Sequence, residues 1–414
     1  MYNQFIFING QYYKVINPGN NYINNAQSNY YCSNLYTNNI NYNLINNNNY
    51  KENYIEINKN PENNNQYHSN INQQSKNENN HKNNFTLNNE KISENKKPCG
   101  IINYGNNCYF NSGLQILASC KLFIQEFGKY KGIKSCLFDF LREAFNKLLI
   151  EEIYDPKNFF IYFCKLNNEK IESQHCSQNF IRNLLKKLND ELIRNGDIHL
   201  INENQFYKPK NQMENDKYNN FIALNKYFPE SNAFKLFTGI TKNHSLGFCN
   251  NCKIYNEELT FNYFIDQIIY LDNIYRTCKF STVLFENIGK LNNLTIFCKK
   301  CKKEIETKEE TKIIKLPEIL IFTLERYQEK TNDTEIIPDE IIDMSNYLDS
   351  SINSRKLEYE LIAINIRFGK TKDFGHEICQ VKRGNKWFEI NDTKAYERTF
   401  EYNRNSYGLV YERK

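Results

Sequence analysis

The residues from Gly100 to Gln115 constrain the fold of this chain more than any others. They read Gly-Ile-Ile-Asn-Tyr-Gly-Asn-Asn-Cys-Tyr-Phe-Asn-Ser-Gly-Leu-Gln. The first half is rich in Gly and Asn, which tolerate tight and left-handed turns, and it therefore predicts a loop. After it, Phe110, Leu114 and Leu117 recur at i, i+4 and i+7, which predicts one face of a helix. The stretch thus predicts a loop that leads directly into a packed helix.

Cys108 lies at the junction between this loop and this helix. Free backbone N–H groups and the positive end of the helix dipole favour a thiolate at such a position. The thiolate is the nucleophilic form of cysteine, so the position suits a catalytic nucleophile. The alternative is a small buried cysteine that opens a core helix. A histidine far along the chain favours the catalytic interpretation.

That histidine, His376, follows Gly375 in a predicted turn and precedes an apolar run, Ile378–Val381. A turn and a second strand then end at Asn391 and Asp392. A hairpin of this kind brings His376 and Asn391 to neighbouring positions, where an acceptor can orient an imidazole. Asp392 is the competing candidate for the same task.

The stretch around Cys108 resembles the cysteine box of the ubiquitin-specific proteases, a large family of papain-like deubiquitinases. The family pattern is Gly-Leu-x-Asn-x-Gly-Asn-Thr-Cys-Tyr-x-Asn-Ser-x-Leu-Gln. This chain has Asn107 where the family usually has Thr, and it keeps Gly100, Asn103, Gly105, Asn106, Cys108, Tyr109, Asn111, Ser112, Leu114 and Gln115.

The region around His376 resembles the histidine box of the same family. The matching positions are Tyr359, Leu361, Ala363, Ile364, Gly375, His376, Trp387, Ile390, Asn391 and Asp392. Two further segments, 316–327 and 406–411, resemble other family segments, so the resemblance spans about Pro98 to Lys414.

The resemblance implies a thiol-dependent deubiquitinase that hydrolyses the isopeptide or peptide bond after the C-terminal glycine of ubiquitin. Cys108 corresponds to the nucleophile and His376 to its general base. Asn391 corresponds to the residue that holds the imidazole, with Asp392 as a helper beside it, and Asn103 to the donor that stabilises the oxyanion. One such donor contributes about 3 kcal/mol in the transition state.

Two CxxC pairs lie between the two boxes, and they predict a metal site. Cys249 with Cys252, and Cys298 with Cys301, each supply two thiols from one tight turn. Two such turns complete a tetrahedral four-thiolate site, which predicts one structural Zn²⁺. Four free cysteines by chance, or redox-active pairs, are the alternatives. In the resembling family this zinc ribbon forms the tip of a fingers subdomain that cradles ubiquitin.

The patterning predicts an α+β fold in which helices precede strands. Apolar stripes predict helices over 137–148 and 177–194, whereas strands are predicted at 258–263, 294–297, 318–324, 359–367, 377–381, 387–390 and 407–411. Residues 202–220 are polar and predict a surface loop or insertion. By resemblance the fold is a papain-like cysteine protease with a helical thumb (about 98–200), zinc-ribbon fingers (about 221–316) and an antiparallel β-sheet palm (about 317–414).

Residues 1–97 are dominated by Asn, Tyr, Lys and Gln and contain little aliphatic surface. Such a segment does not bury enough apolar area to offset the entropy of ordering, so it predicts a largely disordered tail. One exception is the segment 4–17, where a weak strand pair is predicted around Asn9 and Gly10.

Composition excludes several classes of protein. The net charge of +5 is much lower than that of a dedicated nucleic-acid binder. The sequence contains no run of about 18 apolar residues, so no membrane span is predicted. The N-terminus lacks the features of a signal peptide, and an odd count of 13 cysteines favours reduced thiols. We therefore expect a cytoplasmic or nuclear protein that binds neither nucleic acid nor membrane, and the resemblance implies a monomer whose partner is ubiquitin. One alternative remains, in which the lysines beside the CxxC pairs bind nucleic acid. The simpler interpretation is that these lysines form a solvated face.

Besides Asn107, three departures from the family pattern concern substrate binding. Cys176 and Asn179 replace acidic residues that, in relatives, receive the basic C-terminal tail of ubiquitin, and Glu377 replaces an aromatic residue. Each lost charge-assisted contact is worth about 1.5–3 kcal/mol. Two alternatives therefore stay open: a catalytically weak ubiquitin-binding scaffold, and a protease for a ubiquitin-like modifier.

Overall fold

The computed structural model describes residues 4–8, 11–15, 97–149, 153–198, 207–225, 230–271, 276–327, 331–352, 356–369, 371, 374–400 and 404–414. The chain divides into two units, residues 1–82 and 83–414. In the first unit, β1 (Gln4–Ile8) and β2 (Gln11–Val15) pair antiparallel, which agrees with the strand pair predicted from the sequence. The remainder of the predicted tail, up to residue 96, lies outside the described residues.

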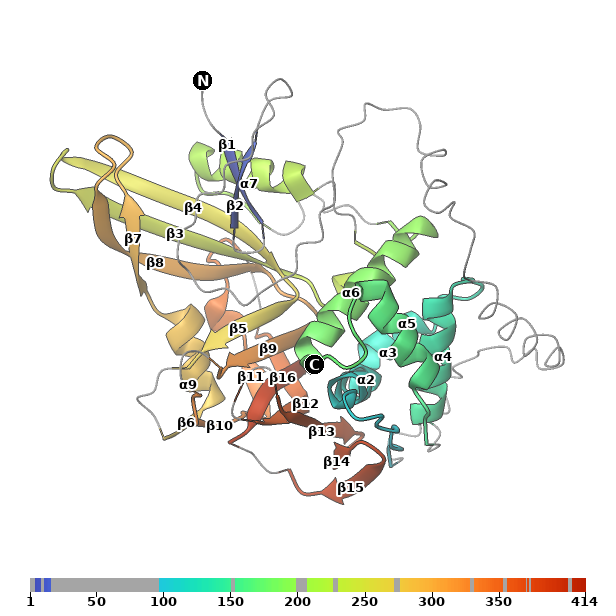
Figure 1. Ribbon diagram of the computed structural model, residues 1–414. Coiled ribbons are helices and arrows are strands. Elements are labelled where there is room, and N and C mark those ends of the chain that lie inside the picture. The colour runs from blue at the N-terminus through green and yellow to red at the C-terminus, as the bar shows by residue number, and fades with distance from the viewer. Residues whose placement is uncertain are drawn as a thin grey trace. The chain divides into compact units, whose positions relative to one another are not determined.

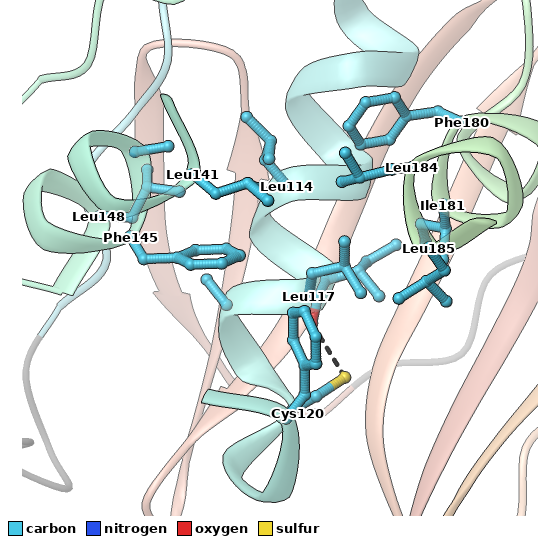
Figure 2. Close-up of a cluster of buried hydrophobic side chains, with 14 of the residues drawn as sticks. Leu114, Leu117, Cys120, Leu141, Phe145, Leu148, Phe180, Ile181, Leu184 and Leu185 are labelled. Carbon is cyan, nitrogen blue, oxygen red and sulfur yellow. Dashed lines mark hydrogen bonds between the residues drawn. The ribbon is translucent and has the colours of Figure 1, made fainter. Parts of the chain in front are cut away.

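The second unit begins with helices that pack around one central helix. This central helix is α2 (Cys108–Ser119), and all of its residues are buried. Figure 2 shows its Leu114 and Leu117 between side chains of two neighbouring helices. The neighbours contribute Leu141, Phe145, Leu148, Phe180, Ile181, Leu184 and Leu185. The helices of this part are α3 (Lys121–Phe127), α4 (Cys136–Leu149), α5 (Lys157–Asn167) and α6 (Ser177–Arg194).

The packing around α2 is close enough to require a glycine. A Cβ at Gly113 would lie 2.3 Å from a ring carbon of Phe180 on α6. Each fully buried Leu or Phe stabilises the fold by about 1.5–3 kcal/mol, so this core fixes the helix that carries Cys108. Its first residue therefore has a well-defined position.

An eight-stranded sheet packs on α2 (Figure 1), and most of its strands come from the C-terminal part of the chain. Its order is β15-β14-β13-β12-β16-β9-β5, and β11 also pairs with β12. The neighbouring strands are antiparallel except β5 and β9, which are parallel. The strands are β5 (Asp266–Tyr270), β9 (Ile319–Glu325), β11 (Ile341–Asp343), β12 (Glu358–Phe368), β13 (His376–Arg383), β14 (Lys386–Asn391), β15 (Lys394–Arg398) and β16 (Ser406–Arg413).

A second, four-stranded antiparallel sheet extends from the same unit (Figure 1). Its order is β4-β3-β8-β7, formed by β3 (Gly239–Cys249), β4 (Ile254–Phe264), β7 (Asn292–Phe297) and β8 (Glu304–Lys315). The two pairs of predicted metal-binding cysteines lie at one end of this sheet. Shorter elements complete the unit: α8 (Asn232–Lys235), β6 (Thr277–Lys279), α9 (Phe280–Leu284), η1 (Phe285–Gly289), β10 (Glu335–Ile337) and η2 (Ser345–Tyr347).

The prediction of a polar loop over residues 202–220 is wrong for much of the segment, because α7 (Gln212–Asn225) begins within it. Tyr218 and Ile222, four residues apart, are buried against Phe261 of β4 and its neighbours. Tyr218 and Ile222 lie one turn apart on the same face, and Met213 and Phe221 pack beside them, so a short apolar face anchors a mostly polar helix. Within the described residues, no helix is both long and apolar enough to cross a membrane.

Candidate active site and metal centre

Cys108 is the first residue of α2 and is 4% exposed. The loop before it is closed by Asn107, whose Oδ1 accepts from the Tyr104 N–H at 2.6 Å and whose Nδ2 donates to the Ile102 carbonyl at 3.1 Å. Gly105 has a φ of +112°, a conformation that favours glycine. Asn107, at the position where the resembling family has Thr, therefore holds the loop that presents Cys108.

The loop lies directly against the turn between β14 and β15. The Ile101 N–H donates to the Asp392 carbonyl at 2.8 Å. A Cβ at Gly100 would lie 2.2 Å from the backbone of Thr393, so only glycine permits this approach. The two motifs that carry the candidate site are therefore in backbone contact, although almost 300 residues separate them in the sequence.

His376, the first residue of β13, lies between Cys108 and Asn391. Its Nε2 is 2.9 Å from Asn391 Oδ1 and 4.0 Å from Asp392 Oδ2. Cys108 is within hydrogen-bonding reach of the ring. Because Asn391 occupies Nε2, Nδ1 is the nitrogen left to face the thiol. This geometry makes Asn391, rather than Asp392, the direct partner of the imidazole.

The surroundings of His376 favour its protonated form. The hydrogen bond with Cys108 raises the pKa of His376 to about 9, against the opposing effect of burial. The bond to Asn391 and the negative charge of Asp392 act in the same direction as Cys108. An imidazolium beside a thiol is the arrangement that stabilises a thiolate.

Asp392 joins the two motifs through its side chain. It has a φ of +51°, and its Oδ1 accepts from Asn111 Nδ2 at 2.8 Å while its Oδ2 accepts from Asn103 Nδ2 at 2.8 Å. An amide nitrogen carries two hydrogens, so Asn103 keeps one for a further acceptor. Asp392 therefore orients Asn103, the residue predicted to stabilise the oxyanion.

The two positions that lack the expected acidic residues lie at the start of α6. Cys176 directly precedes the helix, and Asn179 Oδ1 accepts from Arg182 NH1 at 2.9 Å. Arg182 also forms a bidentate ion pair with Asp266, at 2.8 and 2.6 Å. The nearby carboxylate of Asp266 is therefore already neutralised by an arginine of the same chain.

Glu377 is buried, and its carboxylate pairs with Arg367 at 2.6 Å. The two residues lie directly opposite each other on β13 and β12. The sequence pattern singles out Glu377 but not its partner Arg367. The available signal was a basic residue that follows the mainly apolar run 361–366, because a buried basic residue requires an acidic partner.

The four predicted metal ligands come together at the end of the four-stranded sheet. The sulfur atoms of Cys249, Cys252, Cys298 and Cys301 all lie within 4.8 Å of one another. The two turns repeat the same geometry, since the residues that follow them, Lys253 and Lys302, have φ values of +55° and +60°.

The spacing of these sulfur atoms fits a tetrahedral metal ion. Cys249 Sγ and Cys301 Sγ are 3.6 Å apart, and tetrahedral Zn–S bonds of about 2.3 Å place sulfur atoms about 3.8 Å apart. The cluster can therefore hold a metal ion, and its four thiolates leave no open coordination position.

The fold and the site define a papain-like cysteine hydrolase with a helical thumb, a cysteine-tipped fingers sheet and a β-sheet palm. Residues 99–411 match the family model described as ubiquitin carboxyl-terminal hydrolase. The chain belongs to this family and is a cysteine-type deubiquitinase.

Individual relatives have low sequence identity, but the similarity extends over most of both chains. Ubiquitin carboxyl-terminal hydrolase 12 of Salmo salar is 22% identical over 360 residues, which cover 79% of this chain and 88% of the relative. Ubiquitin carboxyl-terminal hydrolase 4 of Arabidopsis thaliana is 24% identical over 335 residues, which cover 73% and 86%. The fold is similar to that of the SAGA Ubp8/Sgf11/Sus1/Sgf73 DUB module bound to ubiquitin aldehyde, with a TM-score of 0.55 and 20% identity over 78% of this chain and 70% of that chain.

Proposed function

We propose that Cys108, His376 and Asn391 hydrolyse the isopeptide or peptide bond after the C-terminal glycine of ubiquitin. The observation that carries this assignment is the position of His376, whose Nε2 is 2.9 Å from Asn391 while its ring reaches Cys108. A nucleophile, a base and a group that orients the base are the three parts that such chemistry needs.

In the proposed reaction the Cys108 thiol gives its proton to His376, and the thiolate attacks the carbonyl carbon. The resulting oxyanion accepts from the free N–H of Asn103 and from the Cys108 backbone N–H. His376 then donates its proton to the leaving amine, the C–N bond breaks, and a thioester remains on Cys108. Water then gives a proton to His376 and attacks the thioester carbonyl, the C–S bond breaks, and His376 returns this proton to the Cys108 sulfur. The ubiquitin carboxyl group loses its remaining proton to solvent and leaves as the carboxylate.

The direct test is labelling with a ubiquitin probe that carries a C-terminal electrophile, together with turnover of a ubiquitin C-terminal fluorogenic substrate. We expect covalent labelling at Cys108 and hydrolysis. Binding of ubiquitin without turnover would instead assign the chain to the alternative of a catalytically weak scaffold.

The pH dependence of kcat/KM separates the roles of Asn391 and Asp392. The active pair needs protonated His376, whose pKa of about 9 places the alkaline decline of kcat/KM near pH 9. Asn391→Ala removes the acceptor at 2.9 Å, so we expect a decline at lower pH and a rate loss of about 10²- to 10⁴-fold. Asp392→Asn should shift the decline less, because Asp392 lies 4.0 Å away. The reverse order of the two shifts would assign Asp392 to the triad.

We propose that the start of α6 contacts the C-terminal tail of the modifier. If position 176 and position 179 face this tail, Cys176→Asp with Asn179→Glu supplies two acceptors for basic side chains. We expect KM for a ubiquitin substrate to fall by about tenfold with little change in kcat, because the contact is remote from the chemistry. Arg182, which now donates to Asn179, will compete for part of this gain.

The same double variant tests the choice of modifier. An enzyme that naturally prefers a ubiquitin-like modifier with a less basic tail would gain on ubiquitin and lose on that modifier. The measurement is kcat/KM on matched ubiquitin and ubiquitin-like substrates for both proteins. No change on either substrate would show that these positions do not touch the tail.

Truncation tests the proposed boundary between tail and catalytic domain. A chain that begins at Lys96 should hydrolyse the substrate at a rate close to that of the full chain, because residues 1–97 lack a core-forming pattern. Melting temperature and kcat/KM are the measurements. Loss of folding or activity on truncation would place part of the tail within the catalytic domain.

We further propose that the metal held by the four cysteines is Zn²⁺, since this donor set of four thiolates in two tight turns is the usual structural zinc site. Ubiquitin is the proposed partner, and the chain is proposed to act as a monomer in the cytoplasm or nucleus. Light scattering of the purified full chain tests the monomer.

A further inference from the structure

A polar cluster lies behind the catalytic pair and is centred on Glu377, which is 1% exposed. Successive side chains of a strand point to opposite faces, so Glu377 turns inward where His376 turns toward Cys108. Its Oε1 accepts from Arg367 Nη1 at 2.6 Å, and its Oε2 accepts from the Ser177 N–H at 2.9 Å and from Asn365 Nδ2 at 3.1 Å. The Ser177 hydroxyl lies 2.5 Å from the same Oε2, so its single hydrogen is shared between Glu377 and the carbonyl oxygen of Tyr109.

The N–H of Ser177 is one of the unpaired donors at the start of α6, and Cys176 provides no side-chain cap for it. Glu377 therefore caps this helix from a different strand, with its charge at the positive end of the helix dipole. This tertiary cap ties the beginning of β13 to the beginning of α6.

Stability alone is a weak reason to keep such a cluster. Arg367 is 4% exposed, and its guanidinium lies 5.5 Å from the ring of Tyr327 and 5.9 Å from that of Tyr407. Burying both charges carries a desolvation cost, and apolar residues of similar volume often stabilise a fold as well or better. A positional role accounts for the ion pair more directly.

The cluster touches both catalytic segments. Glu377 is the residue after His376, and the Ser177 hydroxyl is 2.9 Å from the carbonyl oxygen of Tyr109, the residue after Cys108. Contacts from Glu377 to Ser177 and from Ser177 to Tyr109 therefore connect the residue after His376 with the residue after Cys108. On the other side of the pair, Asp392 makes the corresponding connection through Asn111 of α2.

We propose that Glu377 and Ser177 are positioning residues that set the distance between Cys108 and His376. Glu377 holds the start of β13 against the first residue of α6, and the Ser177 hydroxyl holds the first turn of α2 against the same residue. Neither residue touches the reacting atoms. The inference rests on the proposed roles of Cys108 and His376.

The deciding variant is Ser177→Ala in the full chain, because it removes the hydroxyl that reaches Tyr109 while the Ser177 backbone N–H still donates to Glu377. A longer distance between thiol and imidazole weakens their pairing, so the pKa of His376 should fall toward its ordinary value. We expect kcat to fall about tenfold with KM within about twofold. The alkaline decline of kcat/KM should begin at a lower pH than in the unaltered enzyme. Ser177→Thr keeps a hydroxyl and should restore kcat to within about threefold.

A matched control is Ser119→Ala on the same helix α2, since the Ser119 hydroxyl donates only to the Gln115 carbonyl, at 2.8 Å. It should leave kcat and the pH profile unchanged. Glu377→Gln should have a larger effect, about 10²-fold in kcat, because it also removes the negative charge that compensates the buried guanidinium of Arg367. Glu377→Gln is expected to lower the melting temperature as well, so Ser177→Ala is the variant that tests the positioning role.

The rate of Cys108 alkylation by iodoacetamide as a function of pH provides a readout without ubiquitin. A lower rate at neutral pH in Ser177→Ala, with an unchanged melting temperature, supports the proposal. The same alkylation profile and kcat in Ser177→Ala as in Ser119→Ala would overturn it. Failure of the unaltered enzyme to hydrolyse any ubiquitin substrate would overturn the proposed function instead, and the alkylation profile would still decide the positioning role.

Discussion

Cys108→Ala is expected to abolish hydrolysis of a ubiquitin C-terminal substrate, with a loss of about 10⁴-fold or more in kcat. The loss is large because no other group can form the thioester, whereas the remaining site can only bind the substrate and polarise its carbonyl. The position of Cys108 at the start of α2 adds to the expected rate loss, since a thiolate there lies at the positive end of the helix dipole.

The fold should tolerate this substitution. Alanine is a good helix former and removes only one sulfur atom at the edge of the core, so the melting temperature should change little. Cys120→Ala is a suitable control, because Cys120 is also buried, at the C-terminal end of the same helix, but lies outside the site. It should remain active. An alanine variant at position 108 that keeps most of its turnover would refute the assignment of the nucleophile.

The sequence predicts elements well where one pattern determines them. The helix predicted over 177–194 is found at those residues in α6, and each predicted strand lies within or beside an observed strand. Periodicity is reliable here because the apolar stripe of α6 is wide and unbroken. It failed for α7, where Tyr218 and Ile222 are the buried apolar residues of a mostly polar helix.

The candidate site was predictable in its residue types but not in its connections. The predicted hairpin placed His376 beside Asn391, and the resemblance to the two family motifs implied that Cys108 lies with them. Neither revealed that Asp392 accepts from both Asn103 and Asn111, because these bonds join segments almost 300 residues apart. Such contacts depend on tertiary packing, which has no local pattern in the sequence.

The burial of Glu377 shows the same limit. From the sequence alone, Glu377 is only a departure from the family pattern, which has an aromatic residue after the histidine. Its meaning depends on Arg367 across the strand pair and on Ser177 at the start of α6, and both contacts exist only in the fold. A substitution in one motif is therefore interpretable only with the residues that pack against it.

Removal of the metal is expected to have the second large effect, on stability. Cys249→Ser and Cys301→Ser should each lower the zinc content from one per chain to near zero. Binding at a structural zinc site of this kind is worth about 10–16 kcal/mol in small domains, and it is part of the folding free energy. We therefore expect the melting temperature to fall by on the order of 10 °C. Elemental analysis and thermal unfolding are the measurements.

The size of this effect follows from how little else holds the end of the four-stranded sheet together. Its buried cluster contains the cysteine pairs and only two fully buried aliphatic residues, Ile296 and Ile305. Two isoleucines contribute about 3–6 kcal/mol, which does not offset the ordering of two turns and four strand ends. Cys136→Ser, at an exposed thiol on α4, is the matched control and should change neither zinc content nor melting temperature. Active protein that contains no zinc, or ligand variants as stable as Cys136→Ser, would show that the four thiols hold this end of the sheet without a metal.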